Sequence, residues 1–95
     1  MEILVNDEER VKVLHAIVAL NNKEHISYMS LQMLADCTQL KLSKTRLVVD
    51  ALVREQLVTK YNVTDKQVRP RYYYVLNESA MKFLEQAASK DTSTV

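Results

Sequence analysis

The residues best suited to chemistry in this sequence are the basic side chains of its middle third. Between Lys41 and Arg71 lie eight lysines and arginines against three acidic residues, a balance of +5, whereas residues 1–40 carry −3 and residues 72–95 carry −1. In a chain whose net charge is only +1, such a segment indicates a surface that meets a polyanion. The alternative is that these charges cover a solvated face and bind nothing.

Part of this basic segment has the spacing of a helix that could enter the major groove of DNA. Small or apolar residues recur at helical intervals and should face the core: Thr45, Val48, Val49 and Leu52. The opposite face should then present Ser43, Lys44, Arg46, Leu47, Asp50 and Arg54. Arg46 is the best candidate for a guanine contact, because its fork matches the O6 and N7 atoms, and Leu47 could pack on a thymine methyl group. We expect phosphate contacts from Lys41, Lys44 and Arg54.

A change of pattern after Gln56 predicts a β-hairpin. Residues 57–63 and 71–76 are rich in β-branched and aromatic side chains, and a polar stretch with Pro70 separates them. The tip adds cations that suit a minor groove or flanking phosphates, namely Lys66, Arg69 and Arg71. In the second strand we expect Tyr74 to lie in the core and Tyr73 to pack across the hairpin.

Four helices are predicted, and each has a recognisable start signal. Asn6 or Asp7 should cap the first, Ser27 or Ser30 the second, and Ser43 the third, which we expect over residues 44–55. Asn77 should cap a last helix that follows the hairpin. We expect residues 1–88 to form a single domain and residues 89–95 to form a flexible tail.

Residues 31–36, 42–58 and 74–80 carry a family resemblance. The stretch LQMLAD resembles the second helix of winged helix-turn-helix regulators of the MarR, PadR and ArsR types, residues 42–58 are similar to their recognition helix, and YVLNESA resembles their entry to the last helix. Gln56 and Ala80 stand where these families usually have glycine. A left-handed backbone at Gln56 would therefore be strained.

The resemblance implies a mainly α fold with a three-helix core, a two-stranded β-hairpin wing and a C-terminal helix. It also implies a transcriptional regulator, which we expect to be a repressor, that binds double-stranded DNA with its third helix in the major groove and its wing on the backbone or minor groove. Because winged helices also bind proteins, a protein-interaction module that uses Leu47 and the basic hairpin is an alternative. A partition or replication-control protein of a plasmid or virus is another.

The first and last helices are apolar on more sides than one small core can cover. One recognition helix spans only a few base pairs, and dimers overcome this limit by binding two half-sites. We therefore expect a homodimer whose interface is formed by Val11, Leu14, Val18, Met81, Phe83, Leu84 and Ala87.

The composition argues against an enzyme, a metal centre and a bound cofactor. The chain has no glycine, which excludes phosphate loops and dinucleotide fingerprints built on that residue. Cys37, the single cysteine, has no metal-ligand spacing to His15 or His25, and we regard it as an ordinary small residue rather than a redox sensor. Because no apolar run could cross a membrane and the start does not resemble a secretory signal, we expect a cytoplasmic protein.

Overall fold

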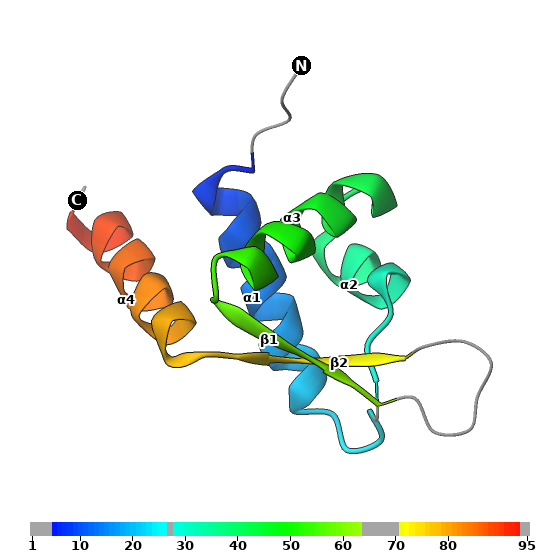
Figure 1. Cartoon of the computed structure of the whole chain (residues 1–95). Coiled ribbons are helices and arrows are strands. Elements are labelled where there is room, and N and C mark those ends of the chain that lie inside the picture. The colour runs from blue at the N-terminus through cyan, green and yellow to red at the C-terminus, as the bar shows by residue number, and fades with distance from the viewer. Residues whose placement is uncertain (1–4, 27, 64–70, 94–95) are drawn as a thin grey trace.

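The computed structural model of the chain describes residues 5–26, 28–63 and 71–93, with side chains as far as residue 87. Four helices and a two-stranded antiparallel hairpin follow one another along the chain (Figure 1). The mainly α architecture predicted from the sequence is confirmed. The elements are α1 (Asp7–Asn21), α2 (Leu31–Thr38), α3 (Leu42–Arg54), β1 (Val58–Asn62), β2 (Tyr72–Leu76) and α4 (Glu78–Ser93).

α1 begins with a capping box and supplies a large part of the core. The Asn6 side chain accepts a hydrogen bond from the Glu9 backbone N–H (2.8 Å), and the Glu9 carboxylate accepts one from the Asn6 N–H (3.1 Å). Leu14 is 0% exposed and lies within the core. The prediction that Leu14 belongs to a dimer interface is therefore wrong, because none of its surface is available to a partner.

The turn between α2 and α3 is made without glycine. Ser30 caps α2, with its Oγ accepting from the Met33 N–H (3.1 Å), and α2 ends at Gln39 in a left-handed conformation (φ 62°). The predicted cap at Ser43 is wrong. α3 starts earlier, because the backbone N–H and the hydroxyl of Thr45 both donate to the Lys41 carbonyl.

The hairpin is joined to the helices through both of its strands. In its register Tyr61 lies opposite Tyr73, as the expected packing across the hairpin requires. Tyr74 is buried, as predicted, and the Met29 N–H donates to the Tyr72 carbonyl (2.7 Å). The predicted tip residues Lys66 and Arg69 lie outside the described residues.

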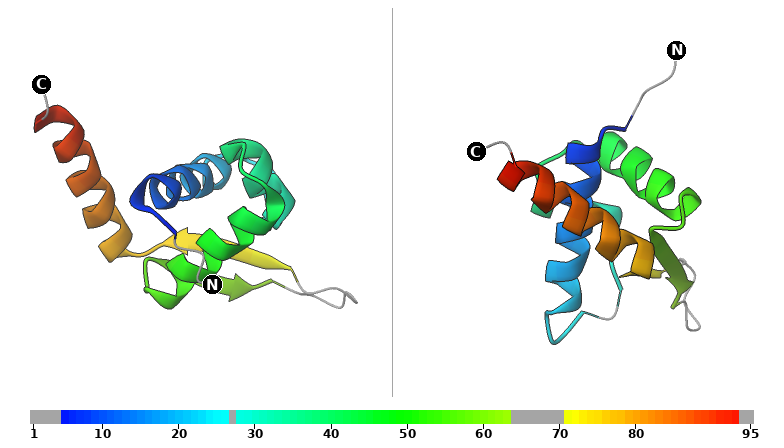
Figure 2. Two further views of the ribbon diagram at one scale, coloured as in Figure 1. Left: turned by 90° about the horizontal axis from the view of Figure 1, so that it is seen from above. Right: turned by 90° about the vertical axis from the view of Figure 1, so that its left-hand side faces the viewer.

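The core lies where α1, α2, α3 and the inner face of the hairpin meet, and α4 touches it only near its start. Its buried apolar members include Val13, Leu14, Ile17, Leu34, Val48, Leu52, Val58, Tyr74 and Ala80. α4 follows β2 and points away from the other helices (Figure 2, left). It continues to Ser93, past residue 88, where we expected the ordered domain to end. Among the described residues, no helix is long and apolar enough to span a bilayer.

Candidate nucleic-acid interface

α3 presents one exposed face along its whole length. Thr45, Val48 and Leu52 turn inward and are buried, which fixes the rotation of the helix about its axis. The opposite side is exposed and carries the predicted DNA-contacting residues Ser43, Arg46, Leu47, Asp50 and Arg54. Lys41, just before α3, is exposed as well. Arg46 and Asp50 form no ion pair with any other described residue.

Lys44 is the exception among the residues predicted on this face. Its ammonium group lies 3.3 Å from the Glu9 carboxylate of α1, and its side chain is only 25% exposed. In a helix the side chain of residue 44 points about 100° away from that of Ser43, which turns it toward α1. Lys44 therefore takes part in the contact between α1 and α3, and its phosphate contact stays a prediction.

A largely apolar hollow of about 500 Å³ opens at the start of α3. Leu42 and Leu47 remain 48% and 37% exposed there, and the half-buried Leu31 of α2 forms the opposite wall. Arg46 and Asp50 line its polar side. Apolar and charged side chains therefore lie side by side on this exposed surface.

A second hollow, of about 440 Å³, lies between α3 and the hairpin and is rich in cations and tyrosines. Lys60 of β1 places its ammonium 4.0 Å from the centre of the Tyr72 ring, and the Arg71 guanidinium lies 4.7 Å from the centre of the Tyr28 ring. Such cation–π contacts orient both charges at the rim. Arg46 and Asp50 line this hollow too, so the two hollows are neighbours that share these residues of α3.

Burial and a nearby carboxylate raise the pKa of the Tyr74 hydroxyl at the base of this second hollow. Desolvation is the larger cause, and the negative charge of Asp50 adds to it. Tyr74 therefore stays protonated at neutral pH and is a neutral hydrogen-bonding group beside Asp50.

Two consecutive residues at the start of α1 hold α3 at both ends. Glu9 pairs with Lys44 in the first turn of α3, and Arg10 makes a two-pronged contact with Glu55, just after the last turn. The Arg10 Nε–Oε1 and Nη2–Oε2 distances are 3.0 and 2.7 Å. Hydrogen bonding to Glu55 is the main reason that the pKa of Arg10 is raised above its ordinary value.

No protein-family model and no curated protein matches the sequence, but solved structures match the fold. A point mutant of Staphylococcus aureus MepR superposes with a TM-score of 0.68, at 16% sequence identity. The match covers 96% of this chain but only 61% of the MepR chain, so this chain spans less than two thirds of MepR. The S. aureus MepR–DNA complex gives 0.58 at 18% identity over 93% of this chain and 72% of the other. The DNA-binding TubR fragment of Clostridium botulinum gives 0.57 at 14% identity over 90% and 99%.

The chain has a winged helix-turn-helix fold. α2 and α3 are the helix-turn-helix, and the β1–β2 hairpin is the wing (Figure 1). The fold that the sequence resemblance implied is confirmed.

Sequence reasoning missed Lys60, which the winged-helix arrangement places on the rim beside α3. Arg71, which was predicted, lines the same hollow. Lys60 lies opposite Tyr74 in the hairpin register, so the two side chains leave the same face of the wing. The alternation of β1 puts Lys60 on the same face as Val58, but its place opposite Tyr74 depends on the hairpin register, which the sequence alone does not give.

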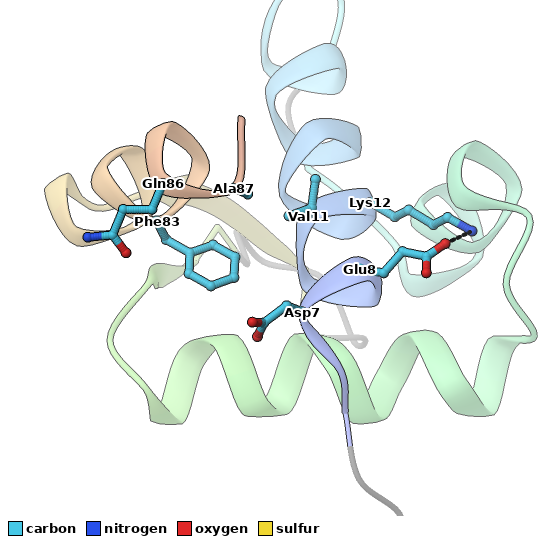
Figure 3. Close-up of a pocket in the computed structure, with 7 residues that line it drawn as sticks. All are labelled: Asp7, Glu8, Val11, Lys12, Phe83, Gln86 and Ala87. Carbon is cyan, nitrogen blue, oxygen red and sulfur yellow. Dashed lines mark ion pairs between the residues drawn. The ribbon is translucent and has the colours of Figure 1, made fainter. Parts of the chain in front are cut away.

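A third hollow separates α1 from α4 on another side of the molecule. It measures about 560 Å³, and the Phe83 ring projects from α4 toward α1 and Val11 (Figure 3). Asp7, Glu8, Lys12, Gln86 and Ala87 complete its lining. Of the other residues predicted for a dimer interface, Met81 is 54% and Val18 37% exposed, and Leu84 is half-buried.

Cys37, near the end of α2, is exposed and free. It lines a hollow of about 510 Å³ between α1 and α2 that His15 and Lys12 also border. Within the described part of the chain, no group of three or more histidine, cysteine or acidic residues is placed to hold a metal ion.

Proposed function

We propose that this chain is a sequence-specific regulator that binds double-stranded DNA with α3 in the major groove and the wing along the backbone or minor groove. The observation that carries the proposal is the exposed face of α3. On this face Arg46 forms no ion pair with another described residue, and it lines the same hollow as Lys60 and Arg71 of the wing. The fold shared with the MepR–DNA complex and with the DNA-binding TubR fragment supports it.

Each cation has a role that follows from its position. Arg46 lies in the second turn of α3, close to the end of a recognition helix that contacts base edges, and its fork suits the O6 and N7 atoms of guanine. Lys41 and Arg54 flank the exposed face and suit phosphates on either side of the groove. Lys60 and Arg71 on the wing suit the backbone that passes between the wing and α3, and Lys66 and Arg69 extend this basic set in the sequence.

We further propose that the protein acts as a homodimer and represses transcription. The outer part of α4 points away from the domain, and a lone helix is marginally stable in water unless an apolar face is covered. A second copy would cover Val11, Val18, Met81, Phe83, Leu84 and Ala87 and would place two copies of α3 on successive half-sites. A dimer bound across a promoter excludes the polymerase by occupancy alone.

Duplex binding and its salt dependence test the DNA proposal. A duplex selected from a random pool should bind the full chain, and the affinity should fall steeply with rising salt, because binding releases counterions condensed on the DNA phosphates. Arg46→Ala should cost about 1–3 kcal/mol on that duplex and relax the preference at one base pair. Lys60→Ala should instead weaken all duplexes alike and flatten the salt slope by about one unit.

Lys82→Ala, which removes an exposed charge from α4, is the matched control and should bind as the parent chain does. Full affinity and full selectivity in Arg46→Ala would show that the base-contact assignment is wrong. If no duplex is bound at low salt, the alternative function, a module that binds another protein, is favoured instead. The apolar hollow around Leu42 and Leu47 is the observation that favours it.

A further inference from the structure

The exposed face of α3 is divided into an apolar and a polar part, and each part matches a different feature of the major groove. Leu42 and Leu47, with Leu31 of α2, surround the hollow at the start of the helix. Arg46 and Asp50 lie on its polar side and extend into the hollow beside the wing. Since both hollows share these two residues, one object can lie against both parts at once.

Asp50 is the unexpected member of this surface. It is an exposed carboxylate, and Arg46, Lys60 and Arg71 line the same hollow. No ion pair with another described residue neutralises it. If the surface met only phosphates, the negative charge of Asp50 would simply repel them. The donors that a duplex offers in its major groove are the amino groups of cytosine and adenine, and in adenine the N7 acceptor lies beside the amino group and disfavours a carboxylate.

We propose, as an extension of the proposed DNA-binding function, that α3 selects a cytosine through Asp50 next to thymines that pack on Leu42 and Leu47. The Asp50 carboxylate accepts from the cytosine N4 amino group, while Arg46, one helical turn earlier, donates to a guanine two base-pair steps away. The two positions are about 6 Å apart along the helix, close to the spacing of two base-pair steps.

The charge balance of the rim makes this arrangement compatible with DNA. Three cations line the hollow that contains the single Asp50 carboxylate, so the surface keeps a positive sum. The apolar part is equally well matched, because the 5-methyl group of thymine is the main apolar feature of the major groove. Leu42 and Leu47 would lose their water only where such methyl groups are present.

Selection from a random duplex pool with three versions of the full chain tests the role of Asp50. The parent chain should select cytosine at one position, with about tenfold discrimination. Asp50→Ala should lose that preference, and Asp50→Asn should move it to adenine, because an amide pairs with adenine N6 and N7. Both variants should bind unrelated duplexes more tightly, since a repelling charge is gone.

Glu85→Gln removes a carboxylate from the exposed side of α4 and should leave the selected sequence unchanged. If Asp50→Ala selects the same sequence as the parent and merely binds more tightly, Asp50 only repels phosphates and the proposal is wrong. Selection of adenine by the parent chain would equally overturn the assignment. The unfolding midpoint of each variant, which should match the parent, separates these outcomes from a folding defect.

Replacement of thymine by deoxyuridine tests the apolar part, because it removes only the methyl group. In the selected duplex this change should weaken the parent chain about fourfold for each contacted methyl group. At the position that Leu47 contacts, the Leu47→Ala variant should bind a duplex with thymine and a duplex with uracil with equal affinity. Equal binding of both duplexes by the parent chain would overturn the thymine contact. If the chain binds duplexes with a steep salt dependence but selects no sequence, it binds DNA and this inference is wrong. If it binds no duplex, the proposed function itself is wrong.

Discussion

Glu9 takes part in three interactions at the start of α1. Its carboxylate accepts from the Asn6 N–H, its backbone N–H donates to the Asn6 side chain, and it pairs with Lys44 of α3. The hydrogen bond from the Asn6 N–H is the main reason that the pKa of Glu9 is lowered, partial burial opposes the shift, and Lys44 adds to the lowering. The ionised form is thus more stable in the folded chain than in the unfolded one.

This lowered pKa makes part of the stability pH-dependent. The contribution of Glu9 is complete above its ordinary value of 4.5 and is lost as the pH falls through the lower folded value. Glu9→Gln should therefore be less stable than the parent by about 0.5–1 kcal/mol at about pH 7, and the gap should shrink at a pH acidic enough to protonate Glu9 in the folded chain. Urea unfolding at both pH values measures it.

Glu8→Gln is the matched control for this prediction. Glu8 belongs to an exposed pair with Lys12 at 3.9 Å, which contributes little in water. Its substitution should change the free energy of unfolding only slightly at either pH. A gap between Glu9→Gln and the parent that stays constant with pH would show that the charge of Glu9 does not stabilise the fold.

Single residues show where sequence reasoning succeeds and where it stops. The caps at Asn6 and Ser30 follow from local chemistry and are confirmed. The pairing of Lys44 with Glu9 was not predicted, because the two residues are distant in sequence. Gln56 adopts the left-handed backbone (φ 63°) that the missing glycine made us suspect. The Gln56 carbonyl accepts hydrogen bonds from the Asn77 and Ser79 side chains, which helps to hold that conformation.

At the scale of elements, the orientation of α3 depends on the first turn of α1. Arg10 is 19% exposed, and besides Glu55 it donates to the Val5 carbonyl (2.8 Å) and to Asp7 (3.2 Å). Arg10 and Glu55 are 45 residues apart, so no local pattern could have predicted the pair. The helical periodicity of α3, by contrast, was enough to predict which of its faces is buried.

Arg10→Lys should lower the free energy of unfolding by about 1–2 kcal/mol, because an ammonium group cannot reproduce the two-pronged contact with Glu55. Denaturant unfolding at neutral pH measures the change. Lys12→Ala, which breaks only the exposed pair with Glu8, should cost less than about 0.5 kcal/mol. Equal effects of the two substitutions would mean that the Arg10–Glu55 contact adds nothing beyond an ordinary surface pair.

At the scale of the whole molecule, the order of elements could be predicted because each has its own periodicity and boundaries. The assembly and the contact surfaces could not be derived in the same way. An apolar residue looks alike in sequence whether it serves the core or a partner, which is why Leu14 was assigned to an interface although it lies in the core. The hollow beside the wing combines residues from α2, α3, β1 and β2, which only the folded chain brings together.

The proposed dimer predicts a mass of twice 11.0 kDa in sedimentation equilibrium at micromolar concentration. Phe83→Glu should split it, since a charge would be buried against the second copy. Affinity for a two-half-site duplex should then fall although no DNA contact has changed. Lys82→Glu, one residue earlier on an exposed part of α4, should stay dimeric. A parent chain that sediments as a single 11.0 kDa species would rule out the dimer.

The double attachment of α3 to α1 also bears on how the molecule opens. Glu9 and Arg10 are neighbours within one helical turn, so fraying of that turn releases both ends of α3 together. We therefore expect the side-chain contacts at both ends of α3 to be lost in one opening event of the first turn of α1, which amide hydrogen exchange would report. Because Asp7, Glu8 and Val11 from the same stretch line the hollow facing α4, covering that hollow would also suppress this opening.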